Sequence, residues 1–250
     1  MRFLLVALVL SVKEISESDL LVSFLSRERG RLSAVAKGAR RSRRRFVNKL
    51  EPGHLLRIHL RKGRSGLTPF LEAADLLFAP ENFRTDPRRF TLASYFIELC
   101  ERSSPPAEGR EIFSLLLENL KFLEKRSPPP ILKPYFELQL LRLLGWSPEF
   151  RGCVACGKEL ASSAYFSFAG GGLRCEHCAR EGDRVISPRT RAVLSALFKL
   201  SPDSLTRLRI PEDEIREVAI LVEAFLKKVL DQDIKALKVL KALESHEKRA

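Results

Sequence analysis

Four of the five cysteines in this 250-residue chain fall into two short pairs, Cys153 with Cys156 and Cys175 with Cys178. Two residues separate the members of each pair, and eighteen separate the pairs. This spacing lets two tight turns present four thiolates to one tetrahedral ion. It predicts a structural site for one Zn²⁺ ion, with two disulfides or a redox pair as the alternatives.

The composition of this cysteine array argues against catalysis. A catalytic zinc keeps an open coordination position, whereas four thiolates close the shell. A zinc deaminase needs an H-x-E motif near P-C-x-x-C, and the sequence has neither. It also lacks a P-loop, a glycine-rich nucleotide fingerprint and a nucleophile motif. We therefore expect a protein that is not an enzyme. The fifth cysteine, Cys100, lies among apolar residues and is expected to be buried.

A second candidate site is the basic segment from Ala36 to Phe46, which reads AKGARRSRRRF. From Arg31 to Arg64 the chain has twelve Lys or Arg and one acid, Glu51, so this region holds most of the chain's net charge of +13. Dense cations favour a polyanionic partner, and the planar fork of arginine suits phosphate oxygens. The alternative is a solvated basic turn without a partner.

The residues predicted to bind nucleic acid all lie in this region. They are Lys37, Arg40, Arg41, Arg43, Arg44, Arg45, Lys49, Arg57, Arg61, Lys62 and Arg64. The first eighty residues contain no Trp and no Tyr, so aromatic platforms for base stacking are scarce. We expect contacts to the phosphate backbone with weak sequence preference.

These cations must be positioned by a small all-β unit, because the first eighty residues hold short apolar or alternating runs separated by glycine. Between residues 55 and 61 apolar residues alternate with cations, which places the cations outward. The cations after the third strand and those on the fourth share one surface only if these two strands are neighbours, which we infer from topology. The predicted strands are Phe3–Val12, Leu20–Ser26, Arg31–Lys37, Leu55–Arg61 and Leu67–Ala74, enough for a small barrel.

After Pro80 the apolar spacing becomes helical. We expect helices over residues 83–102 and 110–126, a third that stops at Gly145, and a fourth with Ser187 as its N-cap. A long apolar face follows between residues 211 and 243. The predicted fold is α+β and multidomain: a five-stranded barrel (1–80), an all-α helical body (81–150 and 183–250) and an inserted four-cysteine zinc ribbon (151–182).

No targeting or membrane segment is expected. The apolar run at residues 3–10 is short and is followed at once by charge, unlike a signal peptide. No stretch approaches the roughly 20 apolar residues of a membrane span. A cytoplasmic location follows if the cysteines are metal ligands.

Three segments together resemble the RecO family of bacterial recombination mediators. They are ESDLLVSFLSRERGRLSAVAKGARRSRRR, FELQLLRLLGWSPEFRGCVACG and the second C-x-x-C. The resemblance covers nearly the whole chain in the right order. It implies an N-terminal OB barrel, a helical body and an inserted zinc ribbon, with Lys37, Arg40 and Arg41 in the DNA-binding segment.

The resemblance also implies a function. Such a protein binds single- and double-stranded DNA, anneals complementary strands, and works with RecR to load RecA onto DNA coated by single-stranded DNA-binding protein (SSB), whose C-terminal tail it binds. A cytoplasmic, nucleoid-associated location would follow. Two alternatives stay open at this stage: an RNA-binding assembly factor, since OB barrels and zinc ribbons also serve RNA, and a zinc-dependent nucleic-acid enzyme.

Overall fold

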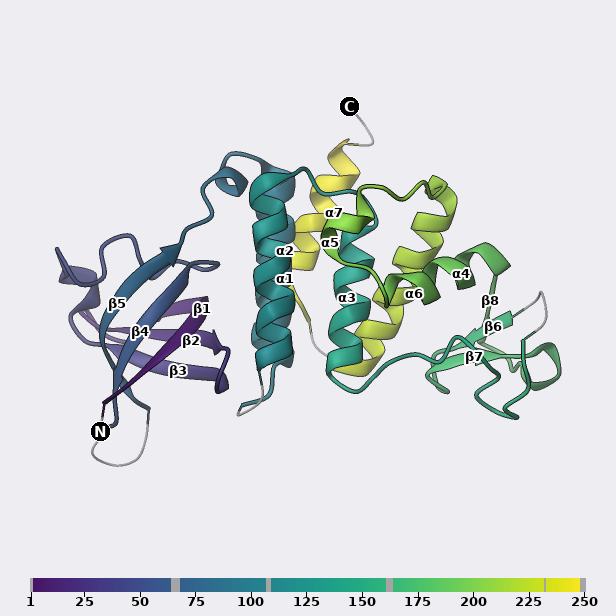
Figure 1. Cartoon of the computed structure of the whole chain (residues 1–250), viewed down its shortest axis with the longest axis horizontal. Coiled ribbons are helices and arrows are strands. Elements are labelled where there is room, and N and C mark those ends of the chain that lie inside the picture. Colours follow the sequence, from purple (N-terminus) through teal and green to yellow (C-terminus); the bar gives the residue numbers. More distant parts are fainter. Residues whose placement is uncertain (1, 64–67, 107–108, 161–163, 232, 248–250) are drawn as a thin grey trace. The chain divides into compact units, whose positions relative to one another are not determined.

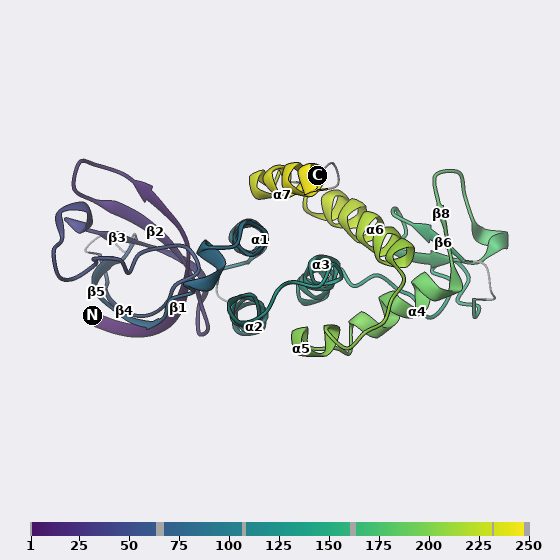
Figure 2. The ribbon, with the colours of Figure 1, turned by 90° about the horizontal axis from the view of Figure 1, so that it is seen from above.

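The computed structural model describes residues 2–63, 68–106, 109–160, 164–231 and 233–247 (Figure 1). The first half of the chain begins with a closed barrel of five strands in the order β1-β2-β3-β5-β4. Figure 2 shows these strands arranged around the barrel axis. The strand order is that of a five-stranded Greek-key OB barrel, which confirms the predicted fold of this part. The strands are β1 (Arg2–Glu14), β2 (Leu20–Ser26), β3 (Gly30–Ala36), β4 (Leu55–Arg61) and β5 (Phe70–Phe78).

The expectation that the third and fourth strands are neighbours is wrong. β5 lies between β3 and β4, pairing with β4 along its length and with β3 at one position, Val35 with Phe70. The predicted limits of the fifth strand also need correction. Leu67 lies outside the described residues, and the strand continues past Ala74 to Phe78 because its pairing with β4 extends to Leu55.

Two helices cover one side of the barrel. α1 (Pro87–Ser103) and α2 (Arg110–Lys125) pack against β1 and β2, as Figure 2 shows. Leu8 and Leu25 face each other in the β1–β2 register and are fully buried on this side.

The C-terminal helix α7 (Lys235–Glu247) packs against α1. The Glu98 carboxylate on α1 accepts hydrogen bonds from the first main-chain N–H groups of α7, those of Lys235 (3.1 Å) and Ala236 (2.7 Å). A carboxylate at this position satisfies orphan donors and complements the helix dipole. Glu98 therefore fixes where α7 begins on α1.

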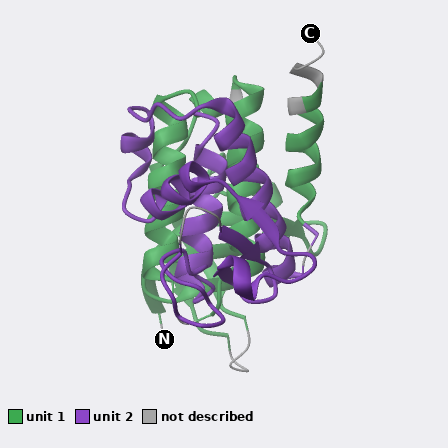
Figure 3. Ribbon diagram, turned by 90° about the vertical axis from the view of Figure 1, so that its right-hand side faces the viewer, with its two compact units in different colours: residues 1–128, 234–250 green, residues 129–233 purple. Residues whose placement is uncertain are grey.

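Figure 3 colours two compact units, residues 1–128 with 234–250, and residues 129–233. The second unit contains helices and a three-stranded sheet in the order β7-β6-β8. Its elements are α3 (Leu132–Leu143), β6 (Ala164–Ser167), β7 (Gly172–Arg174), β8 (Arg184–Ile186), α4 (Pro188–Leu197), α5 (Pro202–Leu205) and α6 (Glu212–Leu230). The predicted domain limits stay a prediction.

Local signals set the helix ends in the second unit. Gly145, with φ of 82°, donates to the carbonyl of Arg142, and Trp146 donates to that of Leu141, which together form a Schellman stop. Ser187 caps α4 by accepting the N–H of Thr190, as predicted. No helix within the described ranges is long and apolar enough to cross a membrane.

Candidate nucleic-acid interface and metal centre

The basic segment after β3 is fixed at both ends by its own apolar residues. Ala39 and Phe46 are buried in the barrel core. Just before them, Gly38 takes up a left-handed conformation (φ 64°) and donates its N–H to Asp19 Oδ1 at 2.8 Å, which lowers the pKa of that carboxyl group. The main chain that carries the arginines between Ala39 and Phe46 is therefore held against the barrel.

Arg40 and Arg41 pair with acids at the end of β1 and in the turn that follows it. Arg40 Nη1 lies 3.0 Å from Glu14 Oε2, and Arg41 Nη2 lies 3.3 Å from Glu17 Oε2. All four side chains are largely exposed, so these ion pairs are weak and screened by salt. Both guanidinium groups can therefore exchange their carboxylate partners for another anion.

A second group of cations gathers over the start of β5. Lys37 Nζ lies 4.8 Å from the centroid of the Phe70 ring, and the Arg61 guanidinium lies 5.1 Å from the same centroid. Arg45 donates to the carbonyl oxygens of Lys37 (3.0 Å) and Glu72 (3.5 Å). The residue after β3 and the end of β4 therefore meet across β5, although the two strands are not neighbours.

Farther along β5, Lys49 and Arg57 bring two more cations to this strand. Lys49 Nζ donates to the carbonyl of Ala74 at 2.7 Å, and Arg57 stands opposite Asp75 in the β4–β5 register. His59 Nε2 lies 3.0 Å from Asp75 Oδ2, and this hydrogen bond lowers the pKa of Asp75, with smaller contributions from Lys49 and Arg57.

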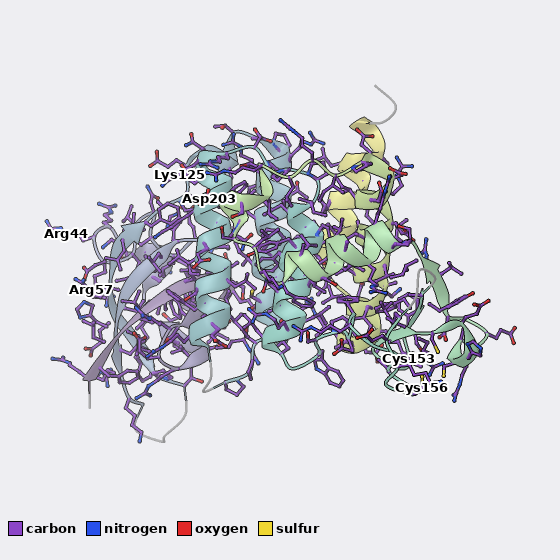
Figure 4. All side chains as sticks on the ribbon, turned by 45° about the vertical axis from the view of Figure 1, so that its right-hand side comes forward. Arg44, Arg57, Lys125, Cys153, Cys156 and Asp203 are labelled. Carbon is purple, nitrogen blue, oxygen red and sulfur yellow. The ribbon has the colours of Figure 1, made fainter. Side chains whose placement is uncertain are left out.

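Four predicted residues are exposed and make no ion pair, side-chain hydrogen bond or ring contact within the described part of the chain: Arg43, Arg44, Arg57 and Lys62. Figure 4 labels Arg44 and Arg57, which both extend outward from the barrel. Arg64 lies outside the described residues. The structure thus brings most of the predicted cations to the β3–β4 connection and to the outer side of β4 and β5.

Arg2 and the acids that reach the basic region were not among the residues predicted from the sequence. Arg2 Nε lies 2.8 Å from Glu72 Oε2, and Arg61 Nε lies 2.7 Å from Glu72 Oε1. Glu14, Glu17 and Glu72 all fall outside residues 31–64, so a charge count over that window overstates the local charge. Glu72 lies on the fifth strand, Glu14 ends the first, and Glu17 follows in the turn to β2, so an outward strand position could have indicated only Glu14 and Glu72.

The four paired cysteines form a cluster in the second unit. Their sulfur atoms all lie within 4.8 Å of one another, and those of Cys156 and Cys175 are 3.9 Å apart. A tetrahedral ion with Zn–S bonds of about 2.3 Å separates its sulfurs by about 3.8 Å. All five cysteines are free, so the two disulfides of the first alternative are not present, and the redox pair stays an alternative. The donors fit a metal ion.

Tight turns produce this cluster, as the C-x-x-C spacing predicts. Gly157 donates its N–H to the carbonyl of Cys153 (2.8 Å) with a positive φ of 73°, and Cys178 donates to the carbonyl of Cys175 (3.0 Å). Figure 4 labels Cys153 and Cys156, which lie close together in the second unit.

The pKa values of two thiols in the cluster are shifted in opposite directions. Main-chain N–H groups, first that of Cys175, lower the pKa of Cys153 to about 6. The neighbouring thiols of Cys175 and Cys156 raise the pKa of Cys178 to about 12. Four thiolates at this spacing repel one another, so a bound cation would be needed to keep all four deprotonated together. Cys100, by contrast, is fully buried on α1 as expected, and burial raises the pKa of its thiol far above its ordinary value.

The small sheet beside the cluster has a second source of stability. The Phe166 ring on β6 is fully buried and packs edge-on against Phe225 of α6 at 5.6 Å, and it also meets Phe150 at 6.2 Å. Arg174 on β7 pairs with Asp183 at 3.1 Å, with both side chains buried. The strands are therefore anchored to the helices of the same unit.

Comparison with known proteins gives one consistent result. Residues 1–77 match the family model "Recombination protein O N terminal", and residues 84–238 match "Recombination protein O C terminal". The DNA repair protein RecO of Syntrophus aciditrophicus is 32% identical over 94% of both chains. RecO of Myxococcus xanthus is 38% identical over 81% of this chain and 82% of the relative, and RecO of Anaeromyxobacter is 34% identical over 96% and 95%.

Proposed function

The chain belongs to the RecO family of DNA repair proteins, and from this premise we propose that it binds single- and double-stranded DNA, anneals complementary strands and helps to load RecA onto SSB-coated DNA. Within this role the OB barrel holds DNA through its basic surface. The partners are DNA, RecR and the C-terminal tail of SSB, with RecA acting downstream. The protein works without catalysis, in the cytoplasm at the nucleoid.

One observation supports this function best: cations from separate segments meet across β5. Lys37 and Arg61 both lie within about 5 Å of the Phe70 ring, and Arg45 joins them through main-chain carbonyls. Exposed Arg43 and Arg44 extend the same basic surface. A chain of phosphates can contact several of these groups at once, and the release of condensed counterions then favours binding.

Annealing follows from this electrostatic surface. Two DNA strands repel each other through their phosphates, and a basic surface that holds both lowers this repulsion. Base stacking on the protein would compete with pairing between the strands. Phe24 and Phe46 are buried in the barrel, and Phe70 already contacts two cations, so few rings are available for bases. The bases of the bound strands stay free to pair.

The metal in this proposal is one structural Zn²⁺ held by Cys153, Cys156, Cys175 and Cys178. When bound, the ion supplies a cross-link between the two cysteine turns and offsets the thiolate charge. The chain's own residues do the rest: Phe166 anchors the sheet to α6, and Arg174 with Asp183 holds the second turn.

Strand annealing of complementary oligonucleotides coated with SSB tests the function. Replacing Lys37, Arg40 and Arg41 together by Glu should slow annealing strongly, because three contacts to phosphate become repulsive. The matched control replaces three exposed arginines of the second unit, Arg207, Arg209 and Arg216, by Glu.

Equal loss in both triple variants would contradict a role for the barrel surface. Loss in the barrel variant alone supports it. Competition between single-stranded DNA and RNA of equal length separates this function from the RNA-binding alternative: preferential displacement by RNA would contradict the proposal.

A further inference from the structure

One carboxylate sits where β1, β4 and β5 meet on the outer side of the barrel. Glu72 on β5 accepts from Arg61 Nε through Oε1 at 2.7 Å and pairs with Arg2 Nε through Oε2 at 2.8 Å. Arg2 and Arg61 are opposite each other in the β1–β4 register. Each carboxylate oxygen thus serves one arginine, and the two arginines converge on a single acid.

Further cations surround this pair. Arg45 donates to the main-chain carbonyl of Glu72, and Lys37 and Arg61 both lie within about 5 Å of the centroid of the Phe70 ring. A cavity of about 440 Å³ opens beside the carboxylate, with Arg2 and Glu72 among its lining residues and Phe3, Leu4, Leu60 and Ala73 as its apolar walls. Four cations therefore stand around one negative charge, with open space next to it.

The exposure of the three side chains suits an exchange of anions. The Arg2 side chain is 78% exposed and that of Arg61 44%, whereas that of Glu72 is 28% exposed. Ion pairs at such exposed positions are weak and screened by salt. A backbone phosphodiester offers arginine the same kind of oxygen pair as a carboxylate, with the same single negative charge, and the neighbouring phosphates of the strand add to the attraction.

We propose that Arg2 and Arg61 form a phosphate-binding subsite that Glu72 occupies in the free protein, and that a phosphate of the DNA backbone displaces the Glu72 carboxylate on binding. This inference rests on the proposed function and adds two residues to it. Arg2 contacts DNA, although it lies outside the predicted basic segment. Glu72 acts as a built-in competitor that limits affinity.

A competitor of this kind fits a protein that must release DNA. A purely basic surface binds phosphate tightly at low salt and lets go slowly. An acid that reclaims its two arginines when a phosphate leaves makes each contact easier to break. The alternative is that Glu72 has only a structural role and ties β1 to β4 and β5. A subsite predicts tighter DNA binding when Glu72 is neutralised, whereas a structural role alone predicts weaker binding.

The test compares Glu72→Gln with a matched control, Glu118→Gln, which makes the same change in net charge at an exposed position on α2. The dissociation constant for a fluorescent oligo-dT is measured between about 50 and 200 mM salt. Releasing two surface ion pairs should tighten binding by Glu72→Gln about five-fold at the lowest salt. The control should change affinity less than about two-fold, because its charge is screened over distance.

A third variant shows whether the gain comes from the freed arginines. Adding Arg2→Gln to Glu72→Gln should remove a large part of the gain, since one of the two released groups is then absent. Glu72→Gln is also made in a chain in which Arg2 and Arg61 are both changed to Gln. If it still tightens DNA binding there, the inference is overturned. Equal gains in Glu72→Gln and Glu118→Gln, or weaker binding by Glu72→Gln with an unchanged unfolding midpoint, would overturn it too.

The wild-type titration separates this inference from the proposed function. Salt-dependent binding by the wild type with no gain in Glu72→Gln removes the subsite alone. Absence of salt-dependent binding by the wild type removes the proposed function, and the subsite with it.

Discussion

Replacing Arg43 and Arg44 together by Gln should reduce the salt dependence of single-stranded DNA binding without affecting the fold. Both side chains are exposed and make no ion pair within the described part of the chain. The segment that holds them is anchored by Ala39 and Phe46, which are buried in the barrel core and unchanged in the variant. The substitution therefore removes two phosphate ligands and little else.

The size of the effect follows from the number of exposed cations whose charged groups make neither an ion pair nor a hydrogen bond. Five predicted residues qualify among those described: Lys37, Arg43, Arg44, Arg57 and Lys62. Each phosphate contact on a single strand contributes about −0.7 to the slope of log K against log salt, so the wild-type slope should be about −3.5. Losing two contacts should bring it to about −2.1.

These slopes convert into affinities that are easy to distinguish. Between about 50 and 200 mM salt the wild type should lose affinity about 130-fold and the double variant about 20-fold. Fluorescence anisotropy with a labelled oligo-dT measures both. The control, Arg207→Gln with Arg209→Gln, removes two adjacent exposed arginines from the second unit and should keep the wild-type slope. An unchanged slope in the Arg43 and Arg44 variant would refute the reasoning.

Three further results are expected. Removing the metal with a chelator, or changing Cys178 to Ser, should loosen the cysteine turns while the helices persist, as far-ultraviolet circular dichroism and proteolysis would show; complete unfolding would contradict this. Phe166→Ala should lower the free energy of unfolding by about 3 kcal/mol in a denaturant titration, because a buried aromatic ring is lost, and a change under about 1 kcal/mol would contradict its anchoring role. Burial raises the pKa of Glu98, but the N–H groups of Ala236 and Lys235 outweigh it, so the net pKa lies below its ordinary value of 4.5. Its contribution to stability is therefore present above pH 4.5 and lost as the pH falls through the folded-state pKa, and Glu98→Gln should cost about 0.5 to 1 kcal/mol at neutral pH and almost nothing in strong acid. A pH-independent difference between this variant and the wild type would contradict that account.

Local patterns explain what could be predicted from the sequence. The alternation of residues 55–61 defines β4 at its observed limits, because a period of two is a property of neighbouring residues alone. The C-x-x-C pairs predict two tight turns, and the Ser187 cap predicts the start of α4. In each case the residues that determine the feature lie within a few positions of one another.

The strand order could not be predicted in the same way. β1 pairs with both β2 and β4, so β5 closes the barrel between β3 and β4. Pairing of distant strands leaves little trace in either sequence. This strand order still brings the two groups of cations together, because Lys37 and Arg61 both lie near the Phe70 ring of β5.

The acids around the basic surface were missed for a related reason. Glu14 and Glu17 reach Arg40 and Arg41 across the β1–β2 turn, and Glu72 reaches Arg61 from the neighbouring strand. Charge summed along a window of the sequence takes no account of such contacts. The local field of the barrel is set by three-dimensional neighbours, which is why Glu72 became visible as a competitor only in the structure.

The packing of the small sheet also depends on distant residues. The residues between the cysteine pairs hold few large apolar side chains, which made the metal the expected source of stability. Phe225 of α6 supplies the missing partner for Phe166 from about sixty positions away. Metal and aromatic packing therefore stabilise different parts of the same segment.

The most direct test of the central claim is a map of where single-stranded DNA touches the protein. An oligonucleotide with photoreactive bases is cross-linked to the wild-type chain, and the attached peptides are identified by mass spectrometry. We predict cross-links within residues 36–62 and around Phe70 on β5. Cross-links confined to residues 129–233 would contradict the claim that the barrel's gathered cations hold the DNA.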